Sequence, residues 1–155
     1  QTLETHLDPS LCQTDVVVQN KDRLFQRFVK TLTKKHKNIS SDLLLDRLER
    51  RERQSPTSVG GGVAIPHAFI PGIESPAVGA FLLKRAVPFG PTDEDRVRTV
   101  FFLVGKDGNP EHHLPILARI ARLCSTPEFL QVLAKARTSR EAYKTVVSWD
   151  KRIGA

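Results

Sequence analysis

The sequence predicts a layered α/β domain in which helices from both ends of the chain cover a sheet formed by its middle. Two observations lead to this prediction. Apolar residues recur at helical spacing in residues 20–53 and 109–147, whereas residues 58–104 contain short apolar segments bounded by Gly, Pro or Asp. A length of 155 residues, with 39% hydrophobic and 26% charged residues, is also typical of one folded domain.

The N-terminal block is predicted to form two helices. Asn20 is a suitable N-cap for the first, which ends in the basic cluster 34–37, where the helix dipole favours cations. The second helix is expected to begin near Ser40 or Ser41 and to end in the charged run 49–53. The predicted buried stripes are Leu24, Phe25, Phe28, Val29 and Leu32 in the first helix and Leu44, Leu45 and Leu48 in the second.

The middle block is predicted to contain three strands, over residues 58–65, 77–83 and 97–104. The segment Val100–Val104 is continuously apolar, which indicates a strand covered on both faces. Together with the flanking blocks, the predicted order is two helices, three strands and three helices. The order of the strands within the sheet is left open at this point.

Three further helices are predicted in the C-terminal block. Asn109–Pro110 combines an N-cap with Pro at the first helical position, and Thr126–Glu128 repeats this signal for a short helix through Leu133. Thr138 and Glu141 have the spacing of a capping box before the last helix. Helices on both sides of the middle block can cover both faces of a sheet.

Composition limits the possible functions. The net charge of +7 comes mostly from residues 21–53, which favours an anionic or acidic partner. Nucleic acid is a poor candidate for this partner, because the aromatic residues there, Phe25 and Phe28, belong to the buried stripe and no recognition motif is present. Cys12 and Cys124 are too few for a disulfide framework, so a reducing cytoplasm is expected.

The domain organisation is expected to be simple. The uncharged run Gln54–Ile73 is rich in Gly and Pro, so no membrane insertion is expected, and no signal peptide is recognisable. The chain begins at Gln1 and contains no Met, a pattern typical of a domain cut from a longer protein. We expect residues 1–155 to form a single domain, whose oligomeric state the sequence leaves open.

Nucleotide and metal chemistry find little support. Gly60–Gly62 lacks the Lys and Ser/Thr of a P-loop and the spacing of a dinucleotide-binding turn. His112, His113 and Cys124 match no metal-ligand spacing. No cofactor and no metal are therefore expected, and histidine chemistry remains.

His67 follows a strand-like run that ends in Pro66, so we expect its side chain at the end of a strand on a fixed turn. A solvated loop histidine is an equally good reading of this fragment alone. The neighbourhood has no charge, and Phe69–Pro71 follows closely. An exposed apolar collar around one titratable ring favours docking of a partner protein around a reactive group.

Two other candidates come from helix ends. Arg51 and Glu52 close the second predicted helix, where the ordinary alternative is a solvated charged end. His113 lies in the first turn of the helix opening at Pro110, where backbone N–H groups attract anions. An ordinary helix-start histidine is the alternative for His113 and the preferred interpretation for His112.

Together these residues resemble a known family. Arg51–Glu52 with Thr57, the segment Gly60–Ala68 and His113–Leu114 are similar to the enzyme IIA domain of the fructose, mannitol and nitrogen-regulatory class. That family belongs to the bacterial phosphoenolpyruvate-dependent phosphotransferase system, and the resemblance covers about residues 10 to 147. The bulky Phe69–Ile70 departs from the family pattern, in which a small or basic residue is common there.

The resemblance implies a three-layer α/β fold with a mixed sheet and a phosphotransferase site. By this resemblance His67 is the phosphoryl acceptor, Arg51 lies beside the phosphoryl oxygens, and His113 is the second active-site histidine. The phosphoryl group would arrive from the phosphocarrier HPr and leave to a cysteine of a IIB domain. A neutral imidazole is the nucleophile, so a partner must hold its tautomer; a backbone carbonyl is the simplest choice.

Two functions are compatible with this resemblance. The leading hypothesis is a phosphohistidine carrier that works in the cytoplasm for sugar transport. The alternative is a regulatory or transporter-associated binding module of the nitrogen-regulatory type, with no obligatory turnover.

Overall fold

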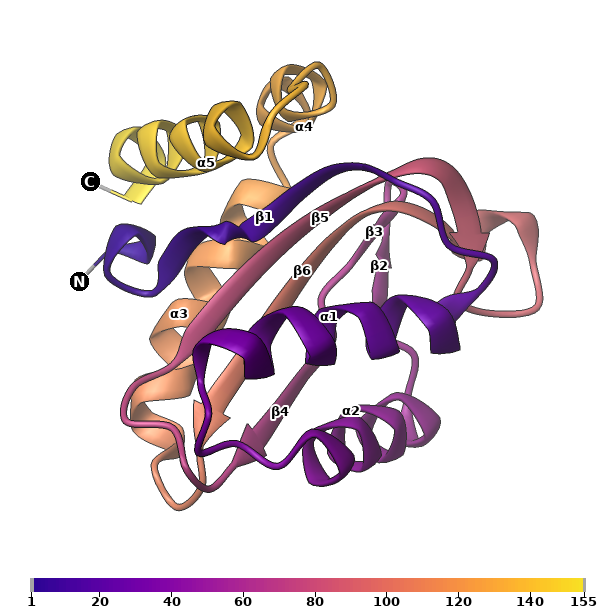
Figure 1. Cartoon of the computed structure of the whole chain (residues 1–155). Helices are drawn as coiled ribbons and strands as arrows, with labels where there is room; N and C mark the ends of the chain where they lie inside the picture. Colours follow the sequence, from indigo (N-terminus) through magenta and orange to yellow (C-terminus); the bar gives the residue numbers. More distant parts are fainter. Residues whose placement is uncertain (1, 155) are drawn as a thin grey trace.

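A six-stranded mixed sheet lies between two layers of helices in the computed structural model, which describes residues 2–154 (Figure 1). The strands are β1 (Leu7–Val16), β2 (Ser58–Gly60), β3 (Val63–Ala64), β4 (His67–Ile70), β5 (Ala77–Pro88) and β6 (Arg96–Lys106). The helices are α1 (Lys21–Lys35), α2 (Ser41–Gln54), α3 (Pro110–Cys124), α4 (Pro127–Leu133) and α5 (Ser139–Gly154). Single turns of 3₁₀ helix occur at Leu3–Thr5 and Asp93–Asp95.

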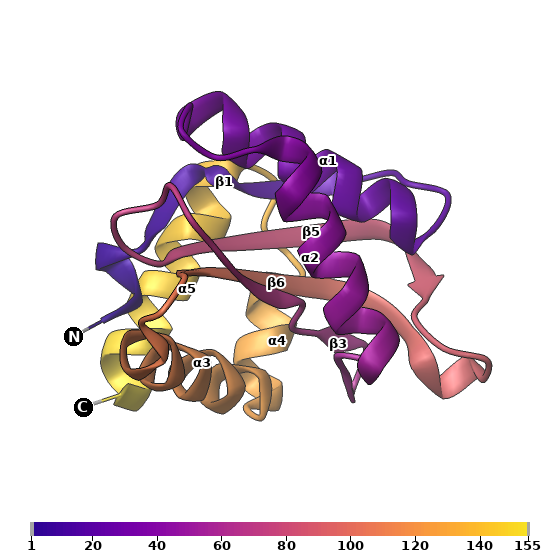
Figure 2. The same ribbon diagram turned by 90° about the horizontal axis from the view of Figure 1, so that it is seen from below.

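The strand order is β1-β5-β6-β3-β2, and β4 also pairs with β6. β1 is parallel to β5, β3 and β4 are parallel to β6, and β5 is antiparallel to β6, as is β2 to β3. The layers are clearest when the molecule is seen from below (Figure 2). The predicted three-layer fold with a central mixed sheet is confirmed.

The helices α1 and α2 cover one face of the sheet. Both begin as predicted, because the side chains of Asn20 and Ser40 accept hydrogen bonds from the backbone N–H groups three residues later. Their apolar stripes pack on the sheet, where the ring of Phe28 stacks on Phe102 with a centroid distance of 4.0 Å. β6 contributes to the cores on both faces, as its continuous apolar run predicts.

The helices α3, α4 and α5 cover the other face. Asn109 occupies the N-cap position of α3, but its side chain donates to His112 Nδ1 at 3.1 Å rather than capping the backbone. Asp150 on α5 is buried, accepts from the backbone N–H of Leu3 and forms an ion pair with Arg119, each at 2.9 Å. These bonds connect both ends of the chain to the same layer.

The predicted order of elements was wrong at three places. β1 was missed because Pro9 and the left-handed Asp15 interrupt its apolar pattern. The segment predicted as one strand over 58–65 forms two short strands joined by Gly60–Gly62, all three at positive φ. β4 was missed because Pro66 indicates the end of a strand, whereas in the structure it lies between two strands, β3 and β4.

None of the helices within residues 2–154 combines the length and apolar character needed to cross a lipid bilayer.

Candidate functional site

His67 is the first residue of β4, not the last residue of a strand as predicted. β3 and β4 lie along the same edge of β6, with Ala64 opposite Val100 and His67 opposite Leu103. Pro66 lies between them and has no N–H for the ladder, although its carbonyl accepts from Leu103 N at 3.0 Å. The interruption between β3 and β4 therefore determines where the His67 ring lies along β6.

A backbone carbonyl holds the imidazole, the simplest of the partners that the tautomer argument allows. His67 Nδ1 lies 2.8 Å from the carbonyl oxygen of Ile65. A carbonyl oxygen accepts hydrogen bonds, so Nδ1 carries the proton and Nε2 keeps its lone pair. Burial is the main cause that lowers the pKa of His67 below 6.5, and the charge of Arg51 lowers it further, whereas the bond to Ile65 raises it. The ring is therefore mostly neutral near pH 7, with the lone pair on Nε2.

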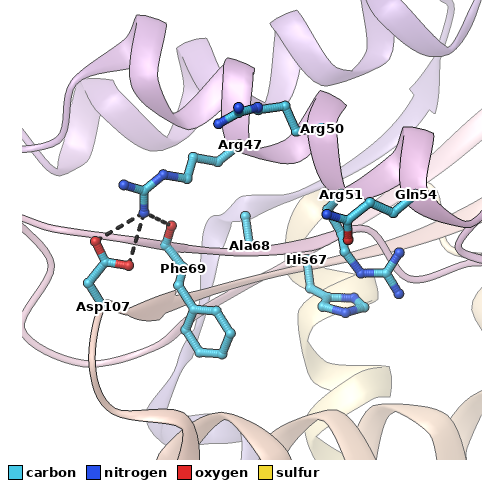
Figure 3. A pocket seen from close by; sticks show the side chains of 8 residues that line it. All are labelled: Arg47, Arg50, Arg51, Gln54, His67, Ala68, Phe69 and Asp107. Carbon is cyan, nitrogen blue, oxygen red and sulfur yellow. Dashed lines mark hydrogen bonds and ion pairs between the residues drawn. The ribbon is translucent and has the colours of Figure 1, made fainter.

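The predicted residues Arg51 and His67 meet at one cavity of about 570 Å³ between α2 and β4. Figure 3 shows the guanidinium of Arg51 beside the imidazole of His67. Arg51 Nη1 donates to the carbonyl of Ser55 at 2.9 Å, which holds this side chain at the end of α2. The cavity is lined by Arg47, Arg50, Arg51, Gln54, His67, Ala68, Phe69 and Asp107.

Arg47 is a site residue that the sequence analysis missed. Its Nη1 donates to the carbonyl of Phe69 at 2.8 Å and to both carboxylate oxygens of Asp107, at 2.9 and 3.0 Å (Figure 3). These bonds connect α2 to β4 and to the turn that follows β6. One signal was available, because a residue four positions before Arg51 lies on the same face of a helix.

The solvated alternative is wrong for Glu52, which is 5% exposed. Its carboxylate accepts from Thr57 N at 3.1 Å and Thr57 Oγ1 at 2.6 Å, and it pairs with Lys21 at 3.4 Å. Thr57 in turn accepts from the backbone N–H of Ile65 at 3.0 Å. A buried carboxylate with these partners fixes the end of α2, and hence Arg51, relative to the segment that carries His67.

His113 lies in the first turn of α3, and its ring centroid is 5.6 Å from that of His67. It is not exposed at the helix end, because its side chain is buried and its ring lies 4.2 Å from that of Phe69. Neither ring nitrogen has a hydrogen-bond partner among residues 2–154. His112 is exposed, consistent with its interpretation as an ordinary helix-start residue.

The predicted exposed apolar collar is wrong. Ile70 is fully buried in the core below α1 and α2, and Phe69 is half-buried against His113. The alternation of a strand, which the missed β4 imposes, sends these two neighbours to opposite sides. Phe69 therefore forms part of the site, whereas Ile70 supports it from the core.

Gly105 on β6 makes room for the His113 ring. A Cβ atom built at this position would lie 2.5 Å from His113 Nδ1 and 3.3 Å from the ring of Phe69. We expect Gly105→Ala to lower the free energy of unfolding by about 1–3 kcal/mol, because one of the two rings must move. Urea unfolding of the variant and the wild type measures this loss.

A double variant provides the control for Gly105. If the His113 ring is the obstacle, adding Gly105→Ala to a His113→Ala chain should cost much less than adding it to the wild type. An equal cost in both backgrounds would show that another contact is responsible.

Burial and the neighbouring His67 lower the pKa of His113 from 6.5 to about 4. As the pH falls below 6.5, His113 takes up a proton in the unfolded protein but stays neutral in the folded protein. Its contribution to folding stability is therefore fully present above pH 6.5 and is lost as the pH falls through the folded pKa. We expect His113 to account for a loss of about 3 kcal/mol between about pH 7.5 and about pH 4.

The measurement is urea unfolding at both pH values for the wild type, His113→Leu and His112→Gln. His113→Leu should lose this part of the pH dependence, whereas His112→Gln, at the exposed neighbouring position, should keep it. If His113→Leu kept the pH dependence of the wild type, His113 would take up its proton equally in the folded and unfolded proteins, and its pKa would not be lowered by folding.

Among residues 2–154 no group of three or more His, Cys, Asp or Glu side chains is arranged to hold a metal ion. The cavity between α2 and β4 is lined by one imidazole and three guanidinium groups.

Comparison with known proteins finds nitrogen regulatory proteins and enzyme IIA domains. A nitrogen regulatory protein of Pseudomonas aeruginosa is 27% identical over 145 residues, which cover 94% of each chain. The crystal structure of nitrogen regulatory protein IIA-Ntr from Neisseria meningitidis superposes with a TM-score of 0.85 at 24% identity, over 93% of this chain and 98% of that one.

A second solved structure has the same fold. It is the complex of enzyme IIA mannitol and phosphorylated enzyme IIB mannitol from Escherichia coli, with a TM-score of 0.74 at 14% identity, over 90% of this chain and 95% of that one. Residues 5–148 match the family described as phosphoenolpyruvate-dependent sugar phosphotransferase system, EIIA 2. The chain belongs to this EIIA 2 family.

Proposed function

We propose that this protein is a phosphohistidine carrier in which His67 Nε2 accepts a phosphoryl group and passes it on. Membership of the EIIA 2 family supports a phosphocarrier role. The observation that carries the residue assignment is the bond from His67 Nδ1 to the Ile65 carbonyl, which leaves Nε2 as the nucleophile in a cavity shared with Arg51.

The transfer needs no proton movement within the chain. The lone pair of Nε2 attacks phosphorus, the bond between phosphorus and the donor nitrogen breaks, and the donor imidazole leaves with that electron pair. The proton stays on Nδ1, where the carbonyl of Ile65 stabilises the positive charge that the ring acquires. Transfer to an acceptor reverses these steps and returns His67 to its neutral form.

The two other predicted residues have different roles in this mechanism. Arg51 offers planar N–H donors to the phosphoryl oxygens, and most of the catalysis comes from such positioning and charge stabilisation. His113 is neutral and buried behind the acceptor, with an unused N–H donor. We assign it the role of supporting the ring of His67 and donating to a phosphoryl oxygen once one is present.

The partners follow from the same proposal. The donor is a phosphorylated carrier of the HPr type and the acceptor a cysteine of a IIB domain, as the solved mannitol IIA–IIB complex of a relative with this fold suggests. We place this relay in the cytoplasm and treat residues 1–155 as one domain.

Reconstitution tests the proposal. The chain is incubated with phosphoenolpyruvate, enzyme I and HPr, and intact mass is expected to increase by one phosphoryl group. Phosphorus NMR distinguishes the two ring nitrogens, and the phosphoryl group is expected on Nε2. A chain that stays unmodified, or one modified on Nδ1, would refute the assignment.

Regulation of a partner is the second candidate, favoured by the relatives. The Pseudomonas and Neisseria proteins are named as nitrogen regulators and align over nearly their whole lengths. A pulldown from lysate, with His67 phosphorylated in one arm and unmodified in the other, discriminates the two functions. A regulator should retain a partner in one state only, whereas a sugar-transport carrier should pass its phosphoryl group to a IIB domain.

A further inference from the structure

A second cavity, of about 370 Å³, lies away from α2, under the segment that joins α4 to α5. Its lining includes Leu82 and Ala136, which belong to the core on the side of α3, α4 and α5. The phosphoryl-acceptor site described above uses none of its residues. The polar groups that line it are Asp15, Lys84, Arg98, Thr99 and Arg137.

The lining of this cavity is positively charged. Lys84, Arg98 and Arg137 contribute three cations against the single carboxylate of Asp15 among the lining residues. The hydroxyl of Thr99 adds a hydrogen-bond donor. Three cations around one concave site attract an anion with more than one charge.

Two of the cationic residues are held in place by backbone hydrogen bonds. Arg98 Nη2 donates to the carbonyl of Lys84 at 2.6 Å, so one of its five N–H donors attaches the guanidinium to β5. The hydroxyl of Thr14 donates to the carbonyl of Arg137 at 3.1 Å, which attaches that segment to β1. The guanidinium of Arg98 is thus attached to the sheet, and the loop that carries Arg137 is attached through its backbone.

A β-bulge in β6 turns Arg98 and Thr99 toward the cavity. The backbone N–H groups of these consecutive residues both donate to the carbonyl of Gly62, at 2.8 and 3.0 Å. Two residues of β6 therefore oppose one residue of the neighbouring segment, the arrangement that reorients side chains in many functional sites.

The two neighbouring strands are irregular at the same level of the sheet. The pairing of β1 with β5 shifts within residues 13–16, where Asp15 adopts a positive φ of 53°. The pairing of β5 with β6 shifts within residues 82–87, the segment that carries Lys84. Irregular pairing in three adjacent strands thus lies at the level of the cavity that Asp15, Lys84, Arg98 and Thr99 line.

We propose that this cavity binds a phosphate monoester of a small polar molecule. The guanidinium groups of Arg98 and Arg137 match the oxygens of a phosphate, with Lys84 and the Thr99 hydroxyl as further donors. The cavity is larger than a phosphate group and has the size of a small-molecule site. The carboxylate of Asp15 then accepts from a hydroxyl of the organic part, which accounts for an acid in a basic site.

The test uses the whole chain carrying His67→Ala and Arg51→Gln, which weakens the other phosphate-attracting site, and follows signals that belong to the second cavity. Glycerol 3-phosphate is titrated into the ¹⁵N-labelled protein, with glycerol as the uncharged control. The amide signals of Lys84, Arg98 and Thr99 are expected to move and saturate with the ester and to stay in place with glycerol. Amide signals that do not saturate would overturn the proposal.

Two matched double variants distinguish binding in this cavity from general electrostatic attraction to the protein surface. Lys84→Gln with Arg137→Gln is expected to weaken binding at least about tenfold. Lys30→Gln with Lys144→Gln removes the same charge at exposed positions outside the cavity and should leave the affinity close to that of the parent chain. Equal weakening in both pairs, or succinate binding as tightly as the ester, would overturn the assignment.

Discussion

A His67→Ala chain is expected to remain unmodified under conditions in which the wild type gains one phosphoryl group. No other side chain in the cavity combines a neutral nitrogen lone pair with a fixed orientation, since its remaining nitrogen-bearing residues are Arg47, Arg50, Arg51 and Gln54. The measurement is intact mass after incubation with phosphoenolpyruvate, enzyme I and HPr.

His112→Gln is the matched control for this variant, because it removes an exposed imidazole at the same end of α3. It is expected to be phosphorylated to the same extent as the wild type. Modification of the His67→Ala chain would place the acceptor elsewhere and would end the proposal. Loss of modification in both variants would point instead to a damaged docking surface for the donor.

Arg51→Gln is expected to slow phosphorylation by about a hundredfold, because loss of one preorganised charged donor removes roughly 3 kcal/mol of transition-state stabilisation. Glutamine keeps a hydrogen-bonding side chain of moderate length but has neither the charge nor the planar fork. The rate is followed by quenched-flow mass measurement at fixed concentrations of phosphorylated HPr.

Arg53→Gln provides the comparison for Arg51. It removes the same charge from the same helix, but Arg53 lines a different cavity, together with Lys21 and Glu49. Its rate is expected to stay within about threefold of the wild type if the effect at Arg51 is local. Equal slowing in the two variants would mean that the general charge of α2, and not the position of one guanidinium, assists the transfer.

Much of the fold could be predicted because the local signals agree with the final structure. The stripes that include Phe28 and Leu48, and the apolar run of β6, face the cores that they predict. β1 could not be predicted because its pairing with β5 is long-range and irregular, so neither a clean alternation nor a turn marks it. The same holds for β4, whose existence depends on contact with β6.

The candidate site, like the fold, could be predicted only in part. His67, Arg51 and His113 were predicted from residue types and family spacing. The structure brings the first two to one cavity and places the ring of His113 5.6 Å from that of His67. The burial of His113 could not be foreseen, because it depends on Gly105, a residue distant in the sequence that leaves space on β6. Local patterns identify chemical groups, but their environment comes from segments that meet in the fold.

The hydrogen bond between the His67 ring and the main chain of Ile65 has an evolutionary consequence. Any residue at position 65 presents the same carbonyl, so substitution there does not remove the group that selects the reactive nitrogen. The surrounding surface can diversify toward new protein partners without loss of nucleophilicity. The orientation of this ring therefore depends on the fold of the main chain and not on the identity of one side chain.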